Sequence, residues 1–192
     1  MFTNNSLSTL PQPSAFVEQV SRRTIPLVDY EMGGVAINDA AQGLQVQLWK
    51  VEVLGTDVWL SAPSVPAFLY FSRPDISEVA LAFDQNMRPF VAFVQNGVAW
   101  LYWYDTQVSA MVFSSFTGAI TPRLTTDEKR AIYSSNSDVI LAYVRANNLY
   151  FRMQRERFQI EHLLASGVNA TLVAIGMNRG NRLQFRLRPT PP

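Results

Sequence analysis

Residues 80–104 read ALAFDQNMRPFVAFVQNGVAWLYWY, and residues 130–154 read RAIYSSNSDVILAYVRANNLYFRMQ. Both stretches are rich in valine and aromatic residues, and the motifs VAFV (91–94) and LAYV (141–144) hold the same place in each. A unit of short strands that repeats at about 50 residues cannot bury its own face, so neighbouring units must stack. The repeat predicts four-stranded antiparallel units, arranged as in a propeller or as a flatter β-sandwich.

Alternation of apolar and polar residues places the strands of both units. In the first unit (78–113) strands are expected near 78–83, 89–95, 98–104 and 107–113, and in the second (130–164) near 130–134, 138–144, 148–154 and 156–164. Asn96 and Gly97 form the hairpin turn of the first unit, since both tolerate positive φ, and Asn147 and Asn148 hold the matching place in the second. The TTDE run at 125–128 fits a capping box and predicts one helical turn between the units.

The whole chain is predicted to be all-β. Residues 1–43 are expected to form an N-terminal arm, irregular through 29–34, and residues 44–188 a single domain. A last hairpin is expected from 172–176 and 182–187. The prolines of residues 189–192 end it in a short tail, because proline cannot donate to a strand ladder.

Composition limits the class of protein. The chain has 192 residues, of which 48% are apolar and 16% are charged. Soluble domains carry about 25% charged residues, so the low fraction favours a homo-oligomer over a chain with merely a large core. There is no cysteine, which excludes disulfides, thiolate metal sites and cysteine nucleophiles. No long apolar run and no basic, apolar leader is present, so neither a membrane span nor a signal peptide is expected.

Charge is unevenly distributed along the chain. Residues 1–140 carry 8 Lys/Arg and 13 Asp/Glu, whereas residues 141–192 carry 8 Arg and 2 Glu. The exposed face predicted for the last strand holds Arg182, Arg186 and Arg188, and a basic patch could also include Arg152, Arg155 and Arg157. Such a patch would suit incidental contact with DNA phosphates, or salt bridges to the acidic half of a neighbouring copy.

Motifs that carry chemistry are few. His162 is the only histidine, and a lone histidine on an alternating strand is more often structural than catalytic. Phosphate-binding glycine loops and the nucleophile elbow of serine hydrolases are missing. We therefore assign no catalytic, cofactor-binding or metal-binding residue, expect no cofactor, and predict that the chain is not an enzyme.

Carboxylates leave one catalytic alternative open, because a pair of them could hydrolyse glycosides. The candidates are Asp57, Asp84, Asp105, Asp138 and Glu161. Asp84 and Asp138 lie in or beside turns, where aspartate commonly bonds its own backbone. Asp105 ends a strand and is equally well explained as an edge charge.

The aromatic strand 98–104 is apolar on both faces. Trp100, Tyr102 and Tyr104 share one face, while Leu101 and Trp103 share the other. Three roles remain open for these rings, namely core packing, a subunit interface and a platform that stacks on sugars.

Three stretches together resemble virion structural proteins of tailed bacteriophages, in particular small tail-associated proteins of short-tailed phages. They are GGVAIND (33–39) with GLQVQLW (43–49), VALAFDQNMRPFVAF (79–93) with LYWYD (101–105), and GMNRGNRLQF (176–185). The resemblance spans about residues 30–188. It implies a viral tail protein present in several symmetric copies, bound to other tail proteins, with no enzymatic residue to carry over.

From this resemblance we expect a non-enzymatic structural component of a phage tail. Its partners would be further copies of itself and portal or adaptor, nozzle and fibre proteins. It would be made in the host cytoplasm and reside in the virion. The alternative is a carbohydrate-binding module for host surface glycan that uses Trp100, Tyr102 or Trp103.

Overall fold

The computed structural model describes residues 30–39, 43–63, 65–84, 86, 88–126, 138–177 and 182–190. These residues form antiparallel strands and one short 3-10 turn. The strands are β1 (Tyr30–Asp39), β2 (Gly43–Leu54), β3 (Asp57–Ala62), β4 (Val65–Ser72), β5 (Ile76–Phe83), β6 (Pro89–Gln95), β7 (Val98–Asp105), β8 (Ala110–Phe116), β9 (Ala119–Thr126), β10 (Val139–Arg145), β11 (Asn148–Met153), β12 (His162–Ala165), β13 (Ala170–Met177) and β14 (Leu183–Pro189), and the 3-10 turn is η2 (Gln154–Glu156).

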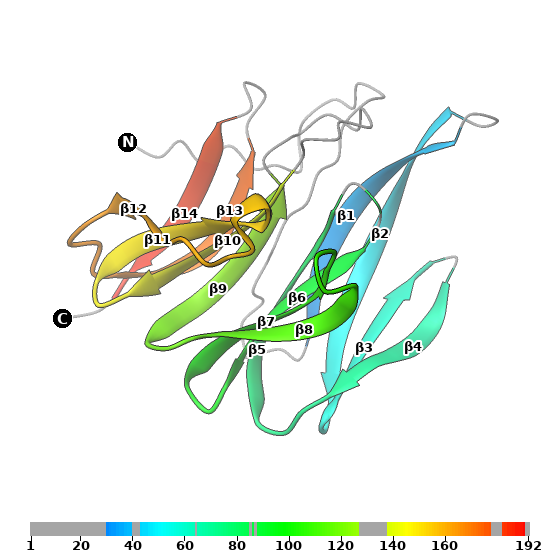
Figure 1. Cartoon of the computed structure of the whole chain (residues 1–192), viewed down its shortest axis with the longest axis horizontal. Coiled ribbons are helices and arrows are strands. Elements are labelled where there is room, and N and C mark those ends of the chain that lie inside the picture. The colour runs from blue at the N-terminus through cyan, green and yellow to red at the C-terminus, as the bar shows by residue number, and fades with distance from the viewer. Residues whose placement is uncertain are drawn as a thin grey trace.

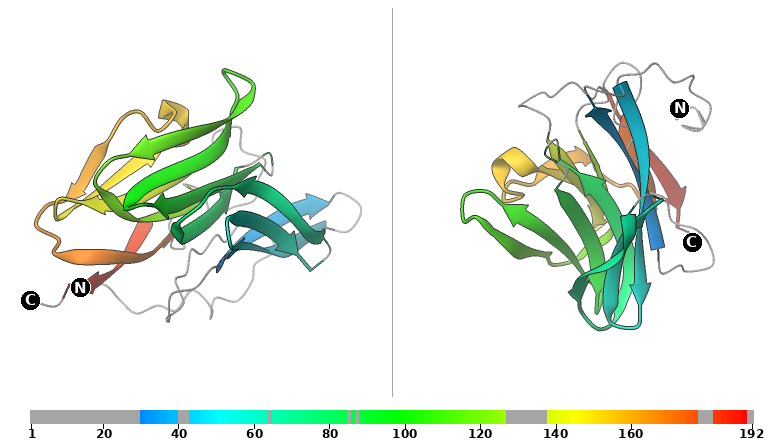
Figure 2. Two further views of the ribbon diagram at one scale, coloured as in Figure 1. Left: turned by 90° about the horizontal axis from the view of Figure 1, so that it is seen from below. Right: turned by 90° about the vertical axis from the view of Figure 1, so that its right-hand side faces the viewer.

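The strands form four sheets in which sequence neighbours pair. The first sheet is β1-β2-β3-β4, the second β5-β6-β7-β8, the third β9-β10-β11-β12, and the fourth β13-β14. Figure 1 shows them side by side in chain order, from β1–β4 to β13–β14, and Figure 2 shows the same series from two other directions. The prediction of an all-β chain built from repeated four-stranded antiparallel units is confirmed.

The repeat seen in the sequence is also a repeat of strand register. In the second sheet Val91 pairs with Tyr102. In the third sheet Leu141 pairs with Arg152, and both residues of this pair lie fifty positions after those of the first pair. Asn96 and Gly97 form the first turn with positive φ of 50° and 75°. The matching turn consists of Ala146 and Asn147, one residue earlier than predicted.

Equivalent residues face the same way in successive sheets. Phe93 of β6 is buried against the first sheet, and Tyr143 of β10, fifty residues later, is buried against the second. Ala92, next to Phe93, faces the third sheet, and Ala142, next to Tyr143, faces the fourth sheet. Because each sheet packs on the next with the equivalent face, the sheets form an open propeller-like series with three cores between them.

The first strands of neighbouring sheets lie against one another along the inner side of this series. Arg123 of β9 is buried there and donates from Nε to the Val173 carbonyl of β13 at 2.9 Å. It also approaches the Glu78 carboxylate of β5 at 3.3 Å. One side chain thus joins the second, third and fourth sheets.

The prediction of irregular chain through 29–34 is wrong from residue 30 onward. Tyr30–Asp39 form β1, which pairs along its whole length with β2, so the first sheet begins before residue 44. The rest of the expected arm, residues 1–29, lies outside the described residues. Gly33 and Gly34 have a weak preference for strands, but pairing with β2 overrides it.

The second unit begins earlier than predicted. Its first strand is β9 (Ala119–Thr126), whereas the expected strand at 130–134 lies outside the described residues. Thr125 and Thr126 end this strand, and the helical turn predicted between the units lies outside the described residues. In the first unit, β8 begins at residue 110 instead of 107, because the Asp105 carboxylate accepts the Gln107 amide and closes a turn there.

The continuous strand predicted at 156–164 is also wrong. The chain makes η2 and then turns at Arg157 and Phe158, whose φ values are 52° and 57°. Only His162–Ala165 form a strand. Alternation of apolar residues predicted a strand here, but Phe158 leaves the alternating pattern to enter the core between the second and third sheets.

Candidate functional site

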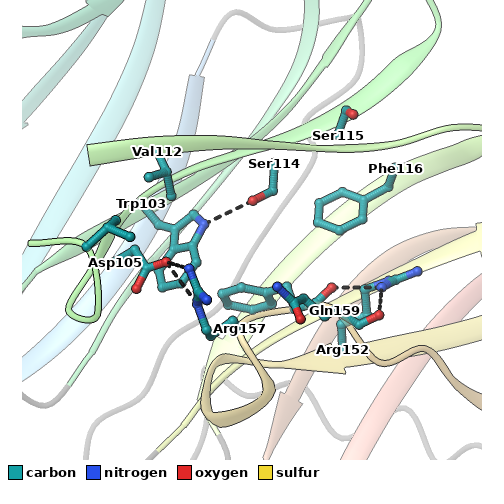
Figure 3. Close-up of a pocket in the computed structure, with 11 residues that line it drawn as sticks. Trp103, Asp105, Val112, Ser114, Ser115, Phe116, Arg152, Arg157 and Gln159 are labelled. Carbon is teal, nitrogen blue, oxygen red and sulfur yellow. Dashed lines mark hydrogen bonds and ion pairs between the residues drawn. The ribbon is translucent and has the colours of Figure 1, made fainter. Parts of the chain in front are cut away.

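The described residues form a pocket at the outer end of the seam between the second and third sheets. It lies between β7–β8 and the segment that follows η2, and has a volume of about 420 Å³. We call it the seam pocket. Its lining residues, most of which are labelled in Figure 3, are Trp103, Asp105, Val108, Val112, Ser114, Ser115, Phe116, Arg152, Arg157, Phe158 and Gln159.

The charged part of the seam pocket is an ion pair. Arg157 donates from Nε to Asp105 Oδ2 at 3.0 Å, and its Nη2 contacts the same oxygen. Burial raises the pKa of Asp105, but hydrogen bonds from Arg157 and from the Gln107 amide outweigh it, so the pKa lies below its ordinary value. Asp105 is therefore an ionised structural anion at neutral pH and not a proton donor. Since it is only 2% exposed, the prediction of an edge charge is wrong.

The apolar part of the seam pocket is aromatic. Trp103 packs edge-on against Phe158, with ring centroids 5.1 Å apart. Phe90 stacks on Trp103, with ring centroids 5.8 Å apart. The indole N–H of Trp103 donates to the Ser114 hydroxyl at 3.2 Å. With its ring packed and its donor satisfied, Trp103 belongs to the core.

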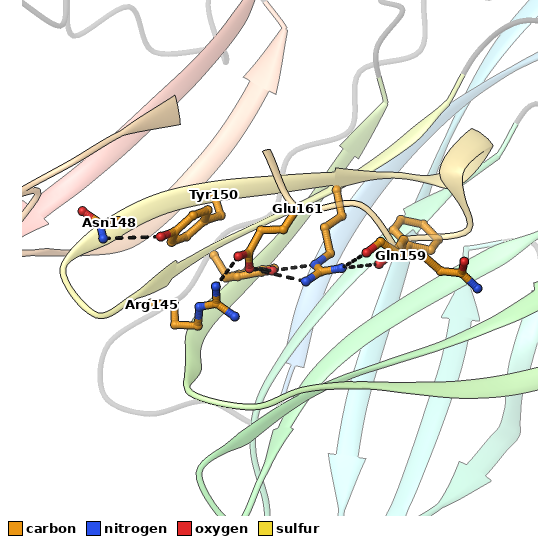
Figure 4. A network of polar contacts seen from close by, with 8 residues as sticks. Arg145, Asn148, Tyr150, Gln159 and Glu161 are labelled. Atoms are coloured by element: carbon orange, nitrogen blue, oxygen red, sulfur yellow. Dashed lines mark hydrogen bonds and ion pairs between the residues drawn. The ribbon is translucent and has the colours of Figure 1, made fainter. Parts of the chain in front are cut away.

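A polar network continues from the seam pocket along the third sheet (Figure 4). The Glu161 carboxylate accepts from the Tyr143 hydroxyl and pairs with Arg145 and Arg152. Arg152 also donates to the carbonyls of Phe158 and Gln159, each at 2.7 Å. The network holds the turn that delivers Phe158 to the core.

Tyr143 is the titratable centre of this network. Burial raises the pKa of its hydroxyl to about 12, and the Glu161 carboxylate adds to that rise, although the hydrogen bond from Arg152 opposes it. The hydroxyl is therefore protonated at neutral pH and acts as a donor. It is not suited to serve as a base.

The other candidate carboxylates also have structural partners. Asp84 accepts the amides of Asn86 and Arg88, each at 2.9 Å, which is the turn role predicted for it. Asp138 accepts the Arg155 amide at 2.9 Å and pairs with the Arg155 side chain. Its turn role stays a prediction, because residues 127–137 before it lie outside the described residues. Asp57 is half-buried at the start of β3 and accepts a hydrogen bond from the Ser72 hydroxyl at 2.7 Å. These contacts bring no two of the five carboxylates together as an acid–base pair.

His162 lies flat against Phe151, with ring centroids 4.8 Å apart. Its Nε2 is 2.7 Å from the Glu156 carboxylate. This is the structural role that the sequence predicted. Within the described residues, no group of three or more histidines and carboxylates could hold a metal ion.

The aromatic strand β7 contributes to two cores. Leu101 and Trp103 face the third sheet, while Trp100 and Tyr102 pack from the other side against the first sheet. Tyr102 stacks on Phe113 at 4.3 Å. Of the three roles left open by the sequence, core packing accounts for these rings.

The predicted basic patch does not form as one surface. Arg186 and Arg188 project outward from β14, as predicted, on the side of the chain opposite Phe185 and Leu187. Arg152 and Arg157, by contrast, point into the seam between the second and third sheets. The third sheet separates the two groups.

Two features of the site were missed by sequence reasoning. The pairing of Asp105 with Arg157 joins residues 52 positions apart, and the turn at Phe158 breaks an alternating pattern. The only local signal was the run QRER at 154–157, which contains two arginines and is too polar for a buried strand. No helix long and apolar enough to cross a membrane occurs in the described part of the chain.

Comparisons with protein-family models, curated proteins and solved structures find no match for this chain.

Proposed function

We propose that this chain is a non-enzymatic structural component of a short bacteriophage tail, assembling in symmetric copies with neighbouring tail proteins as a nozzle, adaptor or fibre-attachment part. The proposal starts from the three stretches, within residues 30–188, that resemble tail-associated proteins. A rigid body that presents surfaces to neighbours is what such a part requires.

The observation that carries the proposal is the way ionisable groups are used. Asp84, Asp105 and Asp138, the buried carboxylates among the described residues, are each held by an arginine and by at least one backbone amide. Catalytic carboxylates need a shifted pKa near the working pH and access to substrate. These groups instead fix turns and clamp sheets, as expected of a scaffold.

The open series of sheets also supports assembly. Its two end sheets each have one face that no described sheet covers, and Leu54 and Leu69 are exposed on that face of the first sheet. Exposed apolar side chains grouped on one sheet are typical of contact surfaces. Contacts between unlike surfaces of identical subunits close into rings when the rotation allows it.

Sedimentation or mass photometry of the pure chain, followed by mixing with purified portal, adaptor, nozzle and fibre proteins of a short-tailed phage, tests the proposal. We expect a ring-sized oligomer or a stable complex with at least one of these proteins. A strict monomer that binds none of them would overturn the proposal.

The carbohydrate-binding alternative depends on an accessible aromatic face. Trp103 is buried and Tyr102 is stacked on Phe113, while the Arg73 guanidinium lies 5.0 Å from the ring centre of Trp100. We therefore expect no change in tryptophan fluorescence when host polysaccharide is titrated in. A saturable shift that is lost in Trp100→Ala would favour the alternative.

A further inference from the structure

The fourth sheet is narrower than the other three. Each of the first three has four strands, whereas the described part of the fourth consists of β13 and β14 (Figure 1). The fourth sheet covers the inner strands of the third through Leu172 and Ile175, which are buried beside Ile140 and Ala142. The outer strands of the third sheet extend beyond this cover.

The fifty-residue repeat shows how much cover is missing. Leu101 and Trp103 of β7 face the third sheet and are 0% and 3% exposed. Their equivalents on β11, Phe151 and Met153, face the fourth sheet and are only partly buried. The same positions are thus sealed in one sheet and left half open in the next, where a third and fourth strand would lie.

Within the described part of the chain, the outer edge of β14 carries backbone groups with which no strand pairs, and two hydrogen bonds show which residues these are. The Leu172 amide donates away from β14, to Thr121 Oγ1, although Leu172 lies opposite Leu187. The Thr190 amide donates toward the β13 side, to the Asn169 carbonyl. Because alternate residues of an antiparallel strand point to opposite sides, Leu183, Phe185 and Leu187 direct their N–H and C=O groups to the outer edge. No described strand pairs with that edge.

Side chains define what would fit beside this edge. Arg186 and Arg188 are exposed on the outer face of β14, while Phe185 and Leu187 face the third sheet. A strand added next to β14 would place alternate residues beside the two arginines and the others over Phe151 and Met153. Opposite charges across a strand pair are favourable, and so is apolar cover over the half-buried side chains of Phe151 and Met153.

We propose that the outer edge of β14 binds an extended segment of a partner protein in which acidic and apolar residues alternate, and that this segment completes the fourth sheet by strand addition. The inference rests on the proposed function in one respect only, since it names the chemistry of a neighbour in the assembly. Exposed edges are the usual template for such pairing.

Hydrogen exchange measured by NMR on the full chain tests the proposal, with a synthetic peptide of alternating valine and glutamate as the probe. Strand addition should slow exchange of the Leu183, Phe185 and Leu187 amides. The amides of Gln184, Arg186 and Arg188 already face β13 and should change little. This odd–even pattern is specific to pairing at the outer edge, because binding by charge alone would not produce it.

Charge variants test the predicted chemistry of the partner. Arg186→Gln combined with Arg188→Gln should weaken peptide binding about tenfold, as two cross-strand charge pairs are lost. The matched control is Thr106→Glu with Gln107→Glu, which makes the same change in net charge on the exposed turn between β7 and β8. It should leave peptide affinity unchanged.

Three results would overturn the proposal. They are an absence of edge protection at saturating peptide, equal affinity for a valine–lysine peptide, and protection that rises with protein concentration without peptide, which would make a second copy the occupant. A chain that assembles with tail proteins but fails this test keeps the proposed function and loses the β14 surface. A chain that binds the peptide but no tail protein keeps the β14 surface and loses the proposed function.

Discussion

Arg157, just after η2, donates from Nε to the Asp105 carboxylate at the end of β7, with 3.0 Å between the two atoms. The pair joins the outer ends of the second and third sheets, and Asp105 at the same time closes the β7–β8 turn through the Gln107 amide. Phe158, the next residue after Arg157, is thereby held against Trp103. This contact links the ion pair to the core, and it motivates the first three predictions.

Arg157→Gln should lower the free energy of unfolding by about 1–3 kcal/mol, between the values for exposed and fully buried pairs, because Asp105 stays buried without its cation. Urea denaturation measures the loss. A double-mutant cycle with Asp105→Asn should give a clear coupling energy. Arg186→Gln, on an exposed face, is the control and should change stability by no more than about 0.5 kcal/mol. Equal effects of the two arginine variants would contradict the clamp.

Stability should fall in acid partly through Asp105. Its pKa in the folded chain is lowered from the ordinary 3.8, so the unfolded chain binds the proton more readily. The stabilisation is present above the unfolded pKa and is lost as pH falls through the folded one. Denaturation series from neutral pH down to the acid limit should therefore show a shallower decline for Asp105→Asn than for the unmodified chain. Parallel curves would exclude this role.

Phe158→Ala should lower the free energy of unfolding by about 3–5 kcal/mol, since Phe158 is 2% exposed and its ring packs against both Phe90 and Trp103. Ile160, two residues later in the same loop, is 54% exposed. Ile160→Ala is therefore the matched control and should change stability by about 0.5 kcal/mol or less. Thermal or urea unfolding of the two variants side by side decides whether the loop anchors the core.

Ala146→Asn should stabilise the chain by about 0.5–1 kcal/mol. Ala146 has φ of 46°, which an alanine adopts at a cost, whereas the equivalent position in the first hairpin is Asn96 with φ of 50°. The reverse substitution, Asn96→Ala, should destabilise by a similar amount. A rise in the urea midpoint for the first variant and a fall for the second is the expected result. The same sign for both would contradict the equivalence of the two turns.

The sequence by itself determined the strands and hairpins of the repeat. Alternation of apolar residues and turn residues such as Asn96 and Gly97 are local signals, and they placed β6, β7, β10 and β11 nearly to the residue. The fifty-residue offset also predicted that units stack. These features follow from side-chain period and backbone preference, which neighbouring residues carry among themselves.

Only the tertiary structure decided which sheet each strand face meets and which charges pair. Asp105 had the same local pattern as an exposed strand end, but Arg157 reaches it from 52 positions away and makes it a buried anion. Phe158 fitted an alternating strand, yet burial between two sheets stabilises a positive φ that its local sequence does not favour. Desolvation and packing depend on residues far apart in the chain, so no local pattern contains them.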